Sequence, residues 1–375
     1  MTRRFSHEEL STIRPVKESA EDDLLARPGV VGVDIGEKVS RGNATGEAGI
    51  LVFVQRKKPL ADLAPEDVVP PDIGGVKTDV QEMEIELQSA MQLLRPGRQV
   101  DGSAYPVLAG GISMGPARSV FKEPPEVEEP GEYLFVGTLG ALVRDRAGGA
   151  AMAMTNFHVA CVDDSWSEGD RMVQPGRPDG GHGTDDQFGS LTRAVLSEDT
   201  DGAVVTIDEG REWEATVTGI GAVAGSIPAE PGMEVQKRGR TTEHTFGTVA
   251  STEATISLDY GDGLGSRTFR HQVRISTDTA RSERFSDGGD SGSVVMDGNN
   301  NVVGLLFAGA TDGSATFANP VATALDELGV DLAVEQEAEP PETPSESPGE
   351  ASGTNITIHV PSGNVTINVV VGGNS

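Results

Sequence analysis

Short apolar runs separated by polar turns make up most of the chain after its first hundred residues. The turns are rich in glycine, aspartate and asparagine. The clearest runs span residues 135–143, 150–156, 202–207, 245–254, 294–296 and 302–307. This rhythm of short strands predicts a mainly β body at 96–334, built as a sandwich or as a pair of small barrels, with a closing helix at 320–329.

The first 95 residues follow a different pattern, which predicts a small N-terminal α/β module. The expected elements are an amphipathic helix at 7–27, strands at 29–35 and 49–54, a short helix at 60–69 and a third strand at 76–85.

Two further segments follow the β body. Residues 335–353 are rich in Glu, Pro and Ser and hold no basic residue, which predicts an extended acidic linker. In residues 354–375, apolar and polar positions alternate on both sides of a Pro-Ser-Gly-Asn turn, as in a β-hairpin. Because an isolated hairpin is marginal in water, we expect this tail to pair with another subunit and the protein to be a homo-oligomer.

The net charge of -30 narrows the range of partners. Such a surface repels nucleic acid and anionic membranes, so neither is expected to bind. Strong acidity with few lysines fits either a salt-rich cytoplasm or an ordinary soluble bacterial protein. Residues 1–27 have no apolar signal core, and no apolar run is long enough to span a membrane, so we expect a cytoplasmic location. Cys161 is the only cysteine, which excludes an internal disulfide.

The charge also predicts a salt dependence of stability. Self-repulsion among the acidic side chains weakens the folded state, and counterions screen it. The melting temperature should therefore rise between low-salt buffer and molar KCl when unfolding is followed by circular dichroism. A flat or falling curve would contradict adaptation to a salt-rich cytoplasm.

The strongest chemical signal is the segment Asp-Gly-Gly-Asp-Ser-Gly-Ser at 287–293. Its glycines let the backbone turn tightly enough to aim successive N–H groups at one point. An oxyanion hole needs this arrangement, with Gly289 and Ser291 as donors and Ser291 as the nucleophile. The alternative is a glycine-rich turn between two strands.

Two other segments supply partners for Ser291. His158 ends an apolar run and is a candidate general base, while Asp201 and its competitor Asp199 precede a buried strand. His158 lies 43 residues before Asp201, which lies 90 residues before Ser291. A serine peptidase triad in the same order has gaps of roughly 45 and 93 residues.

Over about 110–332 the chain therefore resembles the chymotrypsin-like (trypsin-like) serine peptidases, whose fold is a double β-barrel. The resemblance implies that Ser291 attacks the substrate, His158 accepts its proton and Asp201 orients the imidazole. It also implies that Phe307, Ala308 and Gly309, on an apolar strand, bind the substrate.

The resemblance further places Phe285 near the base of the specificity pocket. No carboxylate occurs there, so cleavage after Arg or Lys is not expected, and a small or apolar P1 residue is. Asp290 is expected to bind local backbone donors rather than a freed N-terminus, so we expect no zymogen step.

A narrower resemblance, to the plant Narrow-leaf proteins and their bacterial relatives, covers nearly the whole chain up to Leu332. It rests on short motifs that include Gly-Val-Val-Gly-Val at 29–33, Lys-Lys-Pro at 57–59, Gly-Gly-Ile-Ser at 110–113 and Gly-Thr-Leu-Gly at 137–140. This resemblance implies a non-secreted, often oligomeric protein.

These observations favour a serine endopeptidase that hydrolyses peptides or proteins through an acyl-enzyme and needs no cofactor. The alternative is a catalytically weak scaffold that uses the same cleft to bind peptides. His182 lies among aspartates at 179, 185 and 186, but their spacing fits no EF-hand loop, so we expect no metal site.

Overall fold

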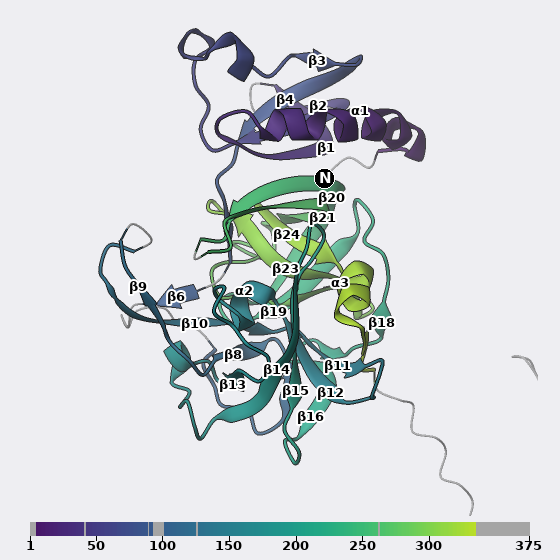
Figure 1. Ribbon diagram of the computed structural model, residues 1–375. Helices are drawn as coiled ribbons and strands as arrows, with labels where there is room; N and C mark the ends of the chain where they lie inside the picture. The colour runs from purple at the N-terminus through teal and green to yellow at the C-terminus, as the bar shows by residue number, and fades with distance from the viewer. Residues whose placement is uncertain are drawn as a thin grey trace, which may run out of the picture. The chain divides into compact units, whose positions relative to one another are not determined.

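The computed structural model describes residues 5–40, 43–88, 90–92, 101–124, 127–261 and 263–334. Within these ranges the chain is mainly β, which confirms the fold class (Figure 1). No helix in them combines the length and the hydropathy that crossing a membrane requires. The expected linker and the expected tail hairpin lie outside the described residues.

A ring of antiparallel strands closes the first barrel. The strands of this sheet are β6 (Ala90–Gln92), β8 (Ile112–Pro116), β9 (Val120–Lys122), β10 (Gly131–Leu139), β11 (Ala141–Asp145), β12 (Ala151–Thr155), β13 (Arg171–Val173), β14 (Gln187–Leu196), β15 (Asp201–Ile207) and β25 (Val330–Leu332). Only Gly140 separates β10 from β11, and pairing runs from β11 through β12, β15, β14, β13 and β8 back to β10. Apolar side chains such as Leu139, Phe188 and Val205 fill the interior.

A second ring closes in the same way. Its sheet contains β5 (Ile85–Leu87), β18 (Gly225–Ser226), β19 (Glu234–Gly239), β20 (Glu243–Asp259), β21 (Ser266–Thr277), β22 (Val294–Asp297), β23 (Asn301–Ala310) and β24 (Ala315–Pro320). Pairing runs from β19 through β22, β23, β24, β21 and β20 back to β19. The two closed rings are the double barrel that the sequence predicted.

Smaller elements complete the barrel region. A three-stranded sheet holds β7 (Leu108–Gly110), β16 (Trp213–Val217) and β17 (Gly221–Ala222), and the helical pieces are α2 (Phe157–Ala160), η3 (Arg177–Asp179) and α3 (Val321–Leu328). Helix α3 is the expected closing helix. It ends where Gly329 adopts a left-handed conformation, as helix C-termini commonly do.

The N-terminal part consists of α1 (His7–Leu25), β1 (Val30–Ser40), β2 (Asn43–Val54), η1 (Leu60–Asp62), η2 (Pro65–Asp67), β3 (Asp72–Ile73) and β4 (Val76–Glu82). Ser6 and Glu9 form a capping box at the start of α1. The short helix expected at 60–69 is replaced by two 3-10 turns. Pro65 is the first residue of the second turn, where its missing N–H costs no hydrogen bond.

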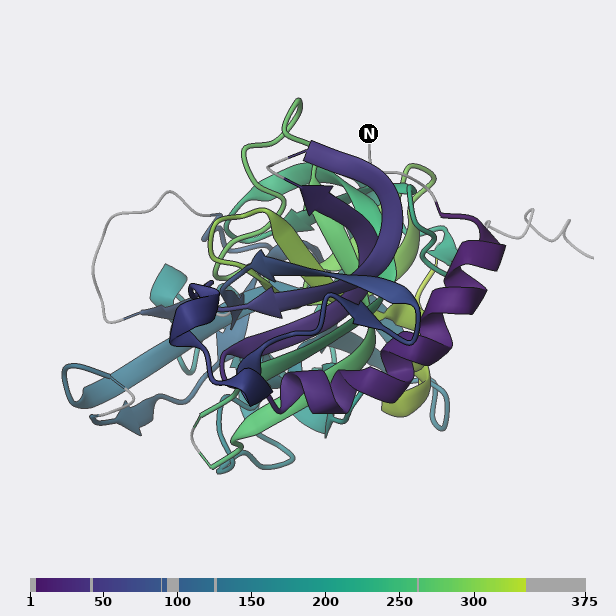
Figure 2. The ribbon, with the colours of Figure 1, turned by 90° about the horizontal axis from the view of Figure 1, so that it is seen from above.

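The sheet of the N-terminal part continues into the second barrel. Strand β1 pairs with β20 at Gly32 and Val33, and α1 lies alongside β1 and β2 (Figures 1 and 2). On the buried side of α1, Nζ of Lys17 donates to Thr255 of β20 at 2.6 Å and lies 2.5 Å from a carboxylate oxygen of Glu21. The first 95 residues are therefore joined to the barrels by strand pairing and by buried polar contacts.

The strand expected at 76–85 divides into two. Strand β4 ends at Glu82 beside β2, whereas β5 pairs with β23 of the second barrel. The chain thus passes from the N-terminal sheet into the barrel region within three residues.

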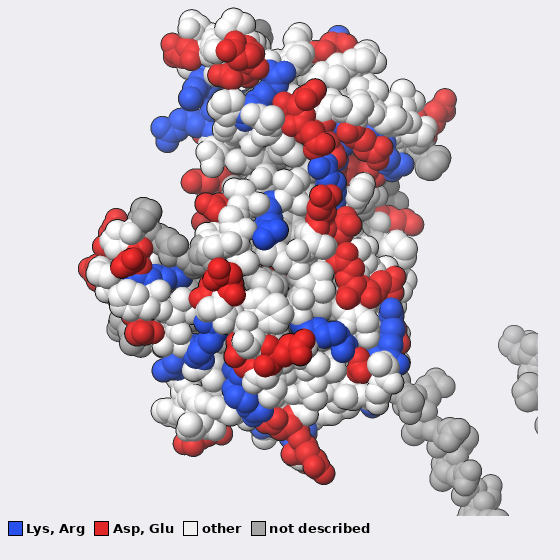
Figure 3. Space-filling model, viewed as in Figure 1, with Lys and Arg blue, Asp and Glu red and all other residues white. Residues whose placement is uncertain are grey.

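Charged side chains of both signs are scattered over the visible face (Figure 3). Acidic side chains lie over the N-terminal part and over the barrels, with lysine and arginine between them. Arg14, for example, makes two hydrogen bonds to the carboxylate of Glu253, and Arg270 contacts Asp22. Such pairs offset part of the self-repulsion expected from the net charge.

The buried pair at Lys17 and Glu21 yields a stability prediction. Lys17→Met leaves the Glu21 carboxylate with one cation fewer, so unfolding in urea should become easier by about 3 kcal/mol. The double variant Lys17→Met/Glu21→Met should recover part of this loss, because it removes the stranded charge. Equal loss in both variants would contradict the argument.

The pair of Lys17 and Glu21 should also make the stability of the folded protein depend on pH. Burial raises the pKa of Glu21, but the hydrogen bond and charge of Lys17, together with Thr255 and Arg270, outweigh it, so the pKa lies below its usual value. The contribution of the pair is complete above the usual glutamate pKa and is lost as pH falls through the lower folded-state value. The stability difference between wild type and Lys17→Met should therefore shrink in acid.

Candidate active site

His158 and Asp201 come from neighbouring strands of the first barrel. Strand β12 ends at Thr155, and the single helical turn α2 carries His158 into a buried position. Asp201 opens β15, which pairs with β12 so that Thr155 faces Ala203. The strand register therefore brings the two side chains to the same end of the barrel.

One carboxylate holds both the ring and the backbone of His158. Oδ2 of Asp201 lies 2.5 Å from Nδ1 of His158, and Oδ1 accepts the backbone N–H of His158 at 3.2 Å. Asp201 is fully buried, and its own N–H donates to Asn319 at 3.1 Å. These contacts fix the imidazole so that Nε2 is the nitrogen left for another partner.

Tyr260 is a third partner of this carboxylate that sequence reasoning missed. Its hydroxyl donates to Oδ2 of Asp201 at 2.5 Å from the end of β20, in the second barrel. Burial, and then the charge of Asp201, raise the pKa of Tyr260 well above its ordinary value, so the phenol stays a neutral donor. No spacing or motif marks Tyr260, because only the docking of the two barrels brings it to Asp201.

The competing acid, Asp199, lies elsewhere. Its carboxylate is partly exposed and is 3.6 Å from Nδ1 of His271. Between the two acids that the sequence left open, the structure brings only Asp201 to His158.

Ser291 lies in a tight loop between β21 and β22 of the second barrel. Gly289 adopts φ +102°, a conformation that favours glycine, and a Cβ there would lie 2.3 Å from the hydroxyl of Thr241. Thr138 of the first barrel binds this loop twice. Its N–H donates to the Ser291 carbonyl at 2.8 Å, and its hydroxyl donates to the Gly289 carbonyl at 2.9 Å.

The two expected oxyanion donors point at a single acceptor. The N–H groups of Gly289 and Ser291 donate to the carbonyl oxygen of Gln88, at 2.6 Å and 3.3 Å. The loop therefore has the convergent geometry that stabilises a developing oxyanion.

The protein has the chymotrypsin-like serine peptidase fold. Two closed antiparallel barrels meet at the site. The first supplies His158 and Asp201, and the second supplies the Ser291 loop.

The chain is similar in sequence to a curated plant protein. Protein NARROW LEAF 1 of Oryza sativa subsp. japonica is 26% identical over 300 residues, which cover 71% of this chain and 48% of that protein. The chain thus spans about half the length of this curated relative. No family model matches the sequence.

Solved structures of bacterial proteases are also similar. Thermobifida fusca Protease A is 22% identical, with 61% of this chain and 99% of that chain covered and a TM-score of 0.42. For Cellulomonas bogoriensis chymotrypsin the identity is 21%, the coverage is 60% and 98%, and the TM-score is 0.39.

Asp290 binds local donors, as expected, and also a buried cation. Its Oδ1 accepts the N–H groups of Thr241 and Thr242, at 2.8 Å and 3.1 Å. Its Oδ2 lies 3.2 Å from Nζ of Lys237, and both side chains are fully buried. Burial lowers the pKa of Lys237, and the negative charge of Asp290 opposes that effect. Lys237, to which the sequence analysis assigned no role in the site, thus supplies an internal positive charge behind the loop.

Ser291 and His158 are not hydrogen-bonded to each other in this arrangement. The Ser291 hydroxyl donates to the carbonyl oxygen of Phe307 at 3.1 Å. Nε2 of His158 is buried and has no hydrogen-bond partner in the described part of the chain. A change in χ1 of Ser291 would free its hydroxyl from Phe307, and such hydrogen bonds often tighten only when substrate binds.

The expected substrate-binding residues fall into two groups. Phe307, Ala308 and Gly309 lie on β23, and Ala308 and Gly309 pair with β5. Phe285, expected at the base of the pocket, is instead packed in an apolar cluster of the second barrel.

The remaining candidates have structural roles. Cys161 is a buried free thiol, and burial raises its pKa. Asp179 is not a solvated turn residue, because it forms a buried ion pair with Arg240. His182 donates its N–H to Asp186 at 2.7 Å. Across the described ranges, no group of three or more His, Cys, Asp or Glu is arranged to hold a metal ion.

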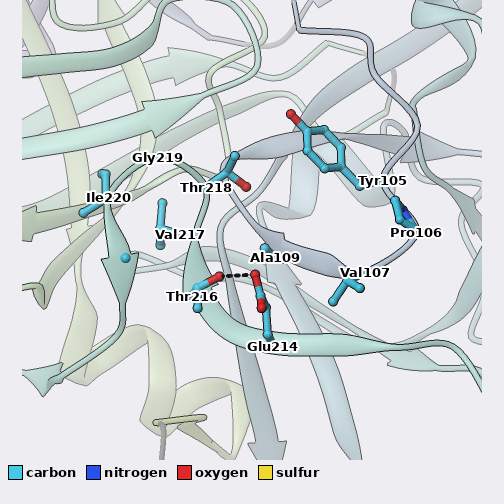
Figure 4. Close-up of a pocket in the computed structure, with 11 residues that line it drawn as sticks. Tyr105, Pro106, Val107, Ala109, Glu214, Thr216, Val217, Thr218, Gly219 and Ile220 are labelled. Atoms are coloured by element: carbon cyan, nitrogen blue, oxygen red, sulfur yellow. Dashed lines mark hydrogen bonds between the residues drawn. The ribbon is translucent and has the colours of Figure 1, made fainter.

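A surface hollow of about 560 Å³ lies away from these residues (Figure 4). It is lined by β7, by β16 and by the turn that follows, with a hydrogen bond between Thr216 and Glu214 at its edge. None of the candidate catalytic side chains lines it.

The buried ion pair of Lys237 and Asp290 leads to a prediction about how readily the Ser291 loop opens. Lys237→Met leaves the Asp290 carboxylate buried without its cation, so the loop should open more readily. Hydrogen exchange measured by mass spectrometry should speed up in peptides covering 287–293, while strand 201–207 stays protected. The exposed Lys58→Met is the control. Unchanged exchange at 287–293 would remove Lys237 from this role.

Proposed function

We propose that the protein is a serine endopeptidase that works through a covalent acyl-enzyme. The observation that carries this proposal is the convergence of the Gly289 and Ser291 N–H groups on one carbonyl oxygen, beside a serine hydroxyl. A glycine-rich turn with no catalytic role has no need of two such donors.

The contacts of His158 support the same reaction. Asp201 holds the imidazole by Nδ1, which leaves Nε2 to accept the proton of Ser291 and later to give it to the leaving amine. Asp201 would stabilise the imidazolium that forms between these steps, and the Tyr260 hydroxyl holds the Asp201 carboxylate in place. Lys237 and Asp290 hold the loop in place without a freed N-terminus, so the proposed enzyme needs no zymogen activation.

One observation favours the scaffold as a second candidate. The Ser291 hydroxyl donates to Phe307 rather than to His158, and a segment of the chain itself occupies the oxyanion donors. A protein with this arrangement locked in place would bind peptides without turning them over.

A fluorophosphonate probe separates the two candidates, because an ordinary serine hydroxyl reacts too slowly to be labelled. We expect labelling of Ser291, complete loss in Ser291→Ala and near-complete loss in His158→Ala. The variant Leu87→Gly/Gln88→Gly weakens the binding of the chain's own segment to the Gly289 and Ser291 N–H groups. It should therefore be labelled at least as fast as wild type. Asp201→Asn should reduce turnover by roughly 10⁴-fold, whereas Asp199→Asn should change it little.

Two nearby serines act as internal controls. Ser286 shares a hydrogen bond with Thr316, and Ser293 donates to the Asp290 carbonyl, so neither should be labelled. Folded protein that resists the probe both as wild type and as Leu87→Gly/Gln88→Gly would favour the scaffold. Labelling that survives Ser291→Ala would mean that another residue is the nucleophile.

A further inference from the structure

A segment of the chain itself pairs along β23. Strand β5 pairs antiparallel with β23, so that Leu87 faces Ala308 and Glu86 faces Gly309. The N–H of Gln88 continues this pairing by donating to the Phe307 carbonyl at 3.0 Å. An extended peptide added to the edge of this strand is how the proposed enzyme would hold a substrate backbone.

Gln88 places its carbonyl group at the reacting position. The carbonyl oxygen accepts both oxyanion donors, Gly289 and Ser291. The backbone of Gln88 is therefore held on both sides of its Cα. Its N–H is bound by Phe307, and its carbonyl oxygen is bound by Gly289 and Ser291. This is the position of the residue whose carbonyl carbon a catalytic serine attacks.

The side chain of Gln88 fills a closed space beside Gly309. Gln88 is only 4% exposed, and a Cβ added to Gly309 would lie 2.2 Å from its Nε2. Gly309 thus makes room for this side chain. Its Oε1 is buried and has no hydrogen-bond partner among the described residues.

The chain also continues along the other side of the cleft. Strand β6 pairs antiparallel with β10 of the first barrel, so that Ala90 faces Val136 and Gln92 faces Leu134. Segments on both sides of Gln88 therefore lie on strands of different barrels, with the Ser291 loop between them. A polypeptide substrate would follow the same path.

We propose that the protein cleaves its own chain after Gln88. This inference rests on the proposed function, since it uses the same nucleophile and base. It differs from the sequence-based expectation of a small or apolar P1 residue, because the residue found in the pocket is glutamine.

The reaction balances with water alone. The Ser291 oxygen adds to the carbonyl carbon of Gln88 while His158 accepts the hydroxyl proton. The C–N bond to residue 89 breaks, and His158 gives the proton to the departing amine. Water then hydrolyses the ester, which leaves a carboxylate on Gln88 and restores Ser291.

Denaturing analysis is needed to detect the cut. Residues before Gln88 stay attached to the barrels through the pairing of β1 with β20 and the contacts of Lys17, so both pieces should remain together in the native protein. The full chain, synthesised in a cell-free system, should convert over time into fragments 1–88 and 89–375, as identified by intact mass. Ser291→Ala should stay whole.

A complementary pair of variants tests the pocket. Gly309→Ala places a methyl group against the Gln88 amide and should slow cleavage at least about 100-fold. Gly309→Ala/Gln88→Ala removes the clash and should restore most of the rate. Failure of the double variant to recover would contradict this placement of the Gln88 side chain.

A second measurement separates this inference from the proposed function. The peptide acetyl-Ile-Glu-Leu-Gln-aminomethylcoumarin copies residues 85–88 and is offered to Leu87→Gly/Gln88→Gly. If this variant hydrolyses the peptide or labels with the fluorophosphonate while the wild-type chain stays whole, self-cleavage is wrong and the peptidase proposal stands. If neither reaction occurs and the wild-type chain stays whole, both the self-cleavage proposal and the peptidase proposal are wrong.

Discussion

The buried ion pair between Lys237 and Asp290 is the interaction on which the candidate site depends. Both side chains are fully buried, and Asp290 also accepts the N–H groups of Thr241, Thr242 and Asp287. Removing one charge would leave the other without compensation in a dry interior. This pair holds the loop in the turn from which the Gly289 and Ser291 N–H groups converge.

The N-terminal part is positioned by strand pairing with the second barrel. Strand β1 extends the sheet of the second barrel, and after β4 the chain continues into β5, which pairs along β23. Gln88 consequently reaches the oxyanion donors as part of the folded chain. The first 88 residues therefore contribute to the cleft as well as to the fold.

Local patterns were enough to predict a mainly β body and the main catalytic candidates, while the choice of two barrels over a sandwich came from the family resemblance. The catalytic candidates could be recognised from the sequence because glycines flank Ser291, an apolar run precedes His158, and the spacing of Asp201 from both residues fits a triad. The contacts of Tyr260, Lys237 and Gln88 could not be predicted in this way, because each depends on how strands that are distant in the sequence pack together. The helix expected at 60–69 is two separate 3-10 turns in the structure, the second of which begins at Pro65.

The central claim is that Ser291 forms an acyl-enzyme. Leu87→Gly/Gln88→Gly would be mixed with an activated ester of acetyl-Ile-Glu-Leu-Gln, quenched in acid within milliseconds to seconds, and examined by intact mass and peptide mapping. We predict a transient mass increase equal to the acyl group, located on Ser291 and absent from Ser291→Ala. No adduct at any time, in protein shown to be folded, would contradict it.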